Sequence, residues 1–92
     1  MGRKRAAGTW DDVRLYLEGG WVKATPAFNL GVALEDRKRY EDAVAAYQSA
    51  IAADPSFADA YFNLSGVYEK LGRGAMALRH LKTYRQLVRG PL

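Results

Sequence analysis

The tripeptide Phe-Asn-Leu occurs twice in this chain of 92 residues, at residues 28–30 and again at residues 62–64, which lie 34 positions later. A shift of 34 also aligns the surroundings of the two copies. Identical pairs outside the tripeptide include Glu35 with Glu69, Arg39 with Arg73, and Ala43 with Ala77. Pairs that keep an apolar or aromatic residue include Leu34 with Tyr68, Val44 with Leu78, and Tyr47 with Leu81. A chance tripeptide would not bring matching surroundings with it, so the chain contains a structural unit that repeats with this period.

Apolar residues at helical spacing predict that the first unit is a pair of helices. One helix is expected from Pro26, with Thr25 as its N-cap, to the charged cluster at residues 35–39. A second begins near Tyr40 and is broken at Asp54, which precedes a proline.

The second unit shows the same pattern. Ser56, with Asp59 three residues later, resembles a capping box for its first helix. A glycine-containing turn at residues 72–74 separates this helix from a last one that ends near residue 90. A further short helix is expected at residues 10–18.

A helix–turn–helix unit that recurs at this period resembles the tetratricopeptide repeat. The residues that carry the resemblance in the first unit are Leu30, Gly31, Leu34, Ala43, Tyr47, Ala50 and Pro55; in the second they are Tyr61, Leu64, Tyr68, Ala77 and Leu81. The second unit departs from the pattern at Ser65, Tyr84 and Arg89, and the last two departures suit a terminal repeat. The resemblance implies an all-α fold in which antiparallel helical hairpins stack as a short right-handed α-solenoid.

On this basis we expect four segments. They are a disordered basic tail at 1–8, a capping helix and connector at 9–23, one repeat at 24–57, and a second repeat with the C-terminal end at 58–92. Because terminal repeats need capping, the last helix is expected to leave apolar residues partly unpaired. These are Leu78, Leu81, Tyr84 and Val88. Either the chain self-associates through them, as a homodimer for example, or it is one piece of a longer protein.

The sequence offers no catalytic constellation, and we expect a protein that is not an enzyme and needs no cofactor. The single histidine, His80, has no carboxylate three or four residues away on its helix, whereas a general base needs a positioned partner. The chain has no cysteine, which excludes disulfides and thiolate metal sites. A basic start with no apolar stretch after it is not a secretory signal, and no run is long enough to cross a membrane, so a cytoplasmic location is expected.

In proteins of the tetratricopeptide family, the first helix of each hairpin lines a concave groove that accepts a peptide or helix of a partner. Carried onto this sequence, the resemblance places in the groove Phe28, Asn29, Val32, Asp36, Asp59, Phe62, Asn63 and Lys70. Either Asn29 and Asn63 grip the backbone of a peptide, or they form hydrogen bonds between neighbouring hairpins. Acidic residues outnumber basic ones in this groove, so a neutral or basic protein or peptide is expected as the partner.

The basic residues lie elsewhere, and the formal net charge of the chain is +4. Arg79, Lys82, Arg85 and Arg89 follow one another at spacings of three and four, and the tail adds basic residues at positions 3–5. A solvated helix face is the simplest interpretation. Contact with nucleic acid or with an acidic protein surface is the alternative. No aromatic residues interleave with the exposed side of the stripe, which weighs against nucleic acid.

Overall fold

A computed structural model of the protein describes residues 23–90, and within this range it contains four α-helices. These are α2 (Ala24–Asp36), α3 (Tyr40–Ala53), α4 (Ala58–Lys70) and α5 (Gly74–Arg89). The described part of the chain is therefore all-α, as the sequence predicts. The expected helix at 10–18 and the basic tail at 1–8 lie outside the described residues.

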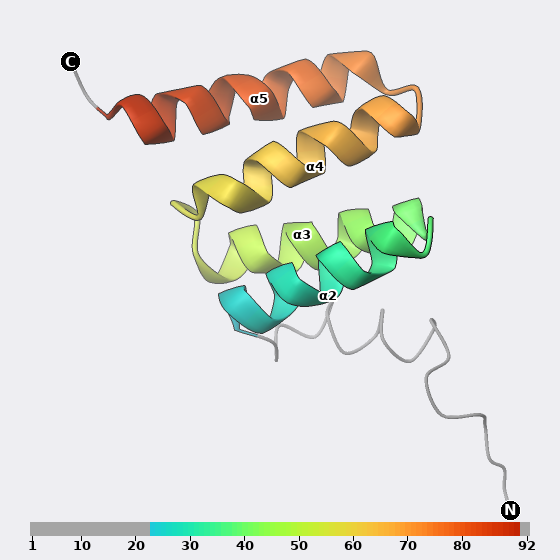
Figure 1. Ribbon diagram of the computed structural model, residues 1–92. Coiled ribbons are helices and arrows are strands. Elements are labelled where there is room, and N and C mark those ends of the chain that lie inside the picture. The colour runs from blue at the N-terminus through green and yellow to red at the C-terminus, as the bar shows by residue number, and fades with distance from the viewer. Residues whose placement is uncertain (1–22, 91–92) are drawn as a thin grey trace, which may run out of the picture.

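The helices form two antiparallel hairpins that stack on each other. α2 packs along α3 and α4 packs along α5, while the contact between the hairpins runs mainly between α3 and α4. Figure 1 shows this order, with α3 and α4 in the middle of the stack and α5 along one outer side. α2 and α4, the first helices of the two hairpins, touch each other only lightly.

The apolar core lies where α2, α3 and α4 meet. Its largest fully buried side chains are Leu34 of α2, Tyr47 of α3, and Leu64 and Val67 of α4. Alanines of the same helices fill the space between them, which allows the helices to approach closely. Within Gly74–Arg89, all of which is described, no residue is fully buried, so α5 is the outermost layer of the stack.

Gly31 and Tyr47 approach each other closely within the first hairpin. The ring of Tyr47 lies against the backbone of Gly31, in space that a side chain at this position would occupy. The second hairpin places Ser65 and Leu81 at the corresponding positions. Leu81 is smaller than tyrosine, and the Ser65 hydroxyl donates to the carbonyl oxygen of Phe62 within its own helix at 2.9 Å. The two positions therefore vary together: a larger residue on α4 accompanies a smaller one on α5.

The turns inside the two hairpins repeat in atomic detail. Lys38 has φ 62° and Gly72 has φ 77°, so both lie in the left-handed region. The amide of Arg39 donates to Leu34 O at 2.9 Å, and at the same place in the second turn the amide of Arg73 donates to Tyr68 O at 2.8 Å. This six-to-one bond closes the helix end and reverses the chain.

The expected N-cap of the first helix is wrong. α2 begins at Ala24 with Lys23 in the N-cap position, and no side chain caps it. Thr25 therefore lies inside the first turn. Proline is tolerated anywhere in the first turn because the first helical amides have no intrahelical acceptor. The position of Pro26 therefore does not determine which residue begins α2.

The expected capping box at Ser56 is also wrong. The N-cap of α4 is Phe57, again without a side-chain hydrogen bond. The amide and hydroxyl of Ser56 instead donate to Asp54 Oδ1 at 3.1 and 2.8 Å. The side chain of Asp54 thus closes a local turn. Ser56 is bound within this turn and does not cap α4.

Candidate partner-binding surfaces

A chain of polar contacts links the two hairpins on the side where α2 and α4 lie. The hydroxyl of Tyr47 donates to Glu35 Oε1 at 2.9 Å and accepts from Asn63 Nδ2 at 3.3 Å. The ammonium of Lys70 donates to the other oxygen of Glu35 at 2.9 Å. Hydrogen bonds therefore connect α2, α3 and α4 at one place. The ring of Tyr47 is fully buried.

The surroundings of Tyr47 and Lys70 favour the protonated form of both side chains. Burial raises the pKa of the Tyr47 hydroxyl well above its usual range, and Glu35 adds to the increase while the Asn63 hydrogen bond opposes it. The phenol therefore stays protonated and keeps donating to Glu35. The hydrogen bond from Lys70 to Glu35 raises the pKa of the lysine, with a smaller electrostatic contribution from Asp36. Lys70 is thus already engaged by acidic groups of α2.

The two repeated asparagines lie in different environments. Asn63 is partly buried and donates to Tyr47 of the preceding hairpin. Asn29, at the same place in the first hairpin, is exposed. The structure thus shows the inter-hairpin role for one copy and leaves the amide of the other on the surface.

The two repeated phenylalanines also differ. Phe28 is partly buried, and its ring centroid lies 5.0 Å from that of Phe57 and 5.7 Å from that of Tyr47. Phe62 is 51% exposed and is backed from one side by Tyr84 of α5, with ring centroids 5.0 Å apart. Phe62 is therefore a large aromatic surface held in place by a neighbour, whereas Phe28 belongs to the packing of the first hairpin.

The remaining residues of the expected groove follow the same face. Val32 is partly buried, and Asp36 and Asp59 are exposed. α2 and α4 together carry four carboxylates and one lysine. This face is acidic, in contrast to α5, whose sequence contains three arginines, one lysine and no acidic residue. The described part of the molecule thus has an acidic side and a basic side.

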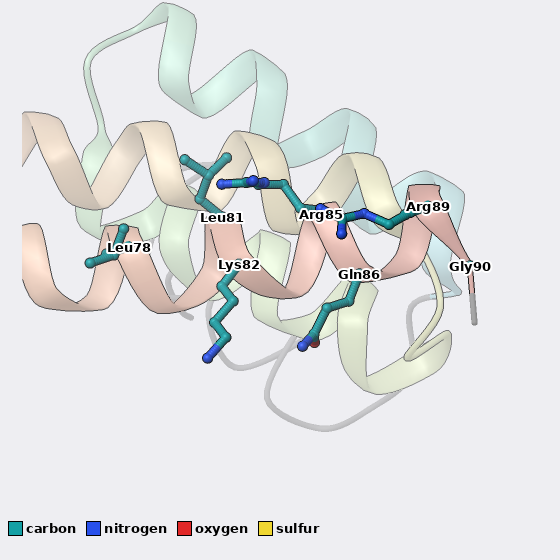
Figure 2. Close-up of a pocket in the computed structure, with 7 residues that line it drawn as sticks. All are labelled: Leu78, Leu81, Lys82, Arg85, Gln86, Arg89 and Gly90. Atoms are coloured by element: carbon teal, nitrogen blue, oxygen red, sulfur yellow. The ribbon is translucent and has the colours of Figure 1, made fainter. Parts of the chain in front are cut away.

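α5 carries two large apolar side chains that are exposed. Leu78 is 69% exposed and Val88 is 58% exposed, whereas Leu81 and Tyr84 are partly buried. A shallow hollow follows this helix, and Figure 2 shows its lining side chains projecting from α5. It is lined by Leu78, Leu81, Lys82, Arg85, Gln86, Arg89 and Gly90. Of the four basic residues that form a stripe in the sequence, three line this hollow; Arg79 does not.

Sequence reasoning offered a hydrogen bond of Asn63 between the hairpins as one alternative but missed the other polar contacts there. Besides the pair of Lys70 and Glu35, Gln48 of α3 donates to the hydroxyl of Tyr68 on α4 at 3.0 Å. Arg73, in the turn before α5, pairs with Glu41 of α3 at 2.6 Å. A tyrosine in an otherwise apolar stripe is a usable signal for such a contact, because a buried hydroxyl needs a partner.

In a comparison with known protein families, residues 31–72 match a family described as TPR repeat. This range covers the C-terminal part of α2 from Gly31, all of α3 and α4, and the start of the turn before α5. A search of curated proteins gives no significant match. In the described residues, no helix is long and apolar enough to span a membrane, and no three metal-binding side chains gather at one place.

Proposed function

Because the chain is a tetratricopeptide-repeat protein, we propose that it is a non-enzymatic module that holds a peptide or helix of a partner protein on the face formed by α2 and α4. Repeats of this family generally mediate protein–protein interaction. Two points are specific to this chain, namely the face that makes the contact and the charge of the partner.

The observation that carries the proposal is the state of Phe62. Half of its surface is exposed, yet its ring packs against Tyr84, so little side-chain freedom remains to be lost on binding. Rigid aromatic side chains of this kind are preferred anchors in protein interfaces. An apolar side chain of the partner would pack on the exposed side of the ring.

The charges around this anchor define the partner further. The exposed carboxylates of Asp36 and Asp59 flank the face, and Lys70 is engaged by Glu35. An acidic peptide would be repelled by them, a neutral peptide would not, and a basic peptide would be attracted. The exposed amide of Asn29 offers donors and an acceptor to a peptide backbone.

A selection of random peptides displayed on phage against the full chain tests this proposal. The selected peptides should combine an apolar residue with lysine or arginine. Phe62→Ala should weaken their binding at least about tenfold, as expected for an interface anchor. Asp59→Lys should weaken it through charge alone, and the loss should shrink in high salt.

The matched control is Leu78→Ala, which removes an apolar side chain that is 69% exposed from the side of α5 that lines the hollow. Thermal melting of each variant separates lost binding from lost folding. The proposal is wrong if the selected peptides are acidic, or if Phe62→Ala and Asp59→Lys both bind as the unchanged protein does while remaining folded.

A further inference from the structure

The outer surface of α5 occupies the same place in its hairpin as a surface of α3 that another helix covers. α4 packs on the side of α3 that carries Val44, Tyr47 and Gln48, and Val44 is only 7% exposed. A shift of one repeat carries Val44 onto Leu78, which is 69% exposed. The fold thus presents on α5 a helix-binding surface whose counterpart on α3 is filled.

The residues of this surface differ from their counterparts in charge. The covered side of α3 carries Val44, Tyr47, Gln48 and Ile51, all of them uncharged; the α5 positions are Leu78, Leu81, Lys82 and Arg85. Arg89 continues the line, and all five α5 residues line the hollow in Figure 2. We call these five residues the α5 face.

We propose that the α5 face docks an acidic amphipathic helix of a partner protein. Its residues at positions i, i+3, i+4, i+7 and i+11 form one stripe along the helix. A second helix that packs alongside contacts residues at this spacing. The two leucines would bury the apolar stripe of the incoming helix. The three cations would pair with carboxylates at the edge of that stripe. This surface lies on α5 and is separate from the face proposed above for neutral or basic peptides.

A second copy of this chain does not fit the α5 face in a symmetric arrangement. Two α5 helices related by a twofold axis would bring the same cations together, because every copy presents the same patch. α5 has no acidic residue that could relieve this repulsion.

A second copy also does not fit as a continuation of the repeat. In that arrangement α2 of the new copy would lie on α5 as α4 lies on α3. Asn29 would meet Leu81 where Asn63 meets the Tyr47 hydroxyl, so its hydrogen bond would be missing. Asp36 would meet Glu69 where Lys70 meets Glu35, so an ion pair would be replaced by two like charges. The chemistry of the α5 face therefore favours an acidic partner over its own chain.

Two synthetic amphipathic peptides about as long as α5 test the proposal. Both carry leucines at i, i+3, i+4 and i+7, flanked by glutamates in one peptide and by lysines in the other. Binding to the full chain is measured by fluorescence anisotropy, and the contact surface is mapped by amide chemical shifts. The glutamate peptide should shift the amides of α5, with an affinity read from those shifts at least tenfold above that of the lysine peptide. Any binding of the lysine peptide should shift the amides of α2 and α4 instead.

Single substitutions make the test specific. Lys82→Glu should weaken the glutamate peptide at least threefold, and Leu78→Ala should weaken it by a similar factor. Both residues are exposed, so the fold should tolerate the changes. Lys23→Glu is the matched control, because it changes the net charge equally at an exposed residue before α2 and should leave the affinity unchanged.

Three results would overturn the proposal. The first is equal affinity of the two peptides for the α5 face, read from the shifts of the α5 amides. The second is an effect of Lys23→Glu as large as that of Lys82→Glu, which would reveal attraction by net charge alone. The third is concentration-dependent mass of the free chain with shifts on α5, which would mean that a second copy occupies the face.

Discussion

Replacing Gly31 with alanine places one methyl group into the close contact between α2 and Tyr47 of α3. The new Cβ would lie 2.5 Å from Cε1, 2.6 Å from Cδ1 and 2.9 Å from Cζ of Tyr47. All three distances are far inside van der Waals contact. The ring has no room to withdraw, because Tyr47 is fully buried and its hydroxyl is bound by Glu35 and Asn63. The backbones of α2 and α3 must therefore move apart.

Two opposing effects set the magnitude. Overpacking a core by one methyl group costs about 1–3 kcal/mol. Alanine recovers about 1 kcal/mol through its better helix propensity. Because the clash involves three ring atoms that are held from two sides, we place the overpacking in the upper part of its range and expect a net loss of about 1–2 kcal/mol. For a domain of this size, the melting temperature would fall by roughly 5–15 °C.

Urea unfolding followed by circular dichroism measures this loss, and Gly66→Ala is the matched control. Gly66 lies inside α4, and the position that a Cβ would take there is open space. Alanine at this position should therefore stabilise the protein by about 0.5–1 kcal/mol. Tyr47→Leu, which copies the second hairpin, should reduce the further cost of Gly31→Ala. If Gly31→Ala is as stable as the unchanged protein, the reasoning from this contact is refuted.

Three further predictions rest on single residues. Lys38→Gly should stabilise the protein by about 0.5 kcal/mol in urea unfolding, because glycine removes the strain of a left-handed lysine but loses more entropy on folding; an unchanged or lower stability would contradict this. Folding raises the pKa of Tyr47, so its contribution to stability is complete below the ordinary tyrosine pKa of about 10 and is lost as the pH rises above it. Tyr47→Phe should therefore flatten the alkaline fall of the unfolding free energy, and an equally steep fall would contradict the assignment. Asn63→Ala should lower the unfolding free energy by about 0.5–1.5 kcal/mol, because it removes the bond to Tyr47, whereas Asn29→Ala at an exposed position should change it little; equal effects in thermal melts would show that the two amides are equivalent.

The architecture could be predicted from the sequence because it depends on features that repeat. The recurrence of Phe-Asn-Leu with its surroundings, small residues at Gly31 and Ala43, and large ones at Tyr47 and Tyr68 define two hairpins and their packing. These features involve shape and hydrophobicity, which a sequence states directly. The outer position of α5 follows from the same repeat, since no described hairpin follows it.

The details that escaped prediction depend on a single chemical group or a single backbone angle. Lys38 has a left-handed conformation that the sequence reveals only at its repeat partner Gly72. Asn29 and Asn63 look equivalent in the sequence, yet within the described residues only Asn63 has a hairpin before it, which places a tyrosine hydroxyl opposite its amide. Repeat symmetry therefore predicts where a side chain lies, but not which partner it finds there.

A chemical-shift map of the full chain with a peptide from the phage selection locates the surface that the peptide contacts. The largest amide shifts should lie on α2 and α4 around Phe62, and Phe62→Ala should remove them. Shifts confined to α5, or none anywhere in residues 23–90, would contradict the proposed function.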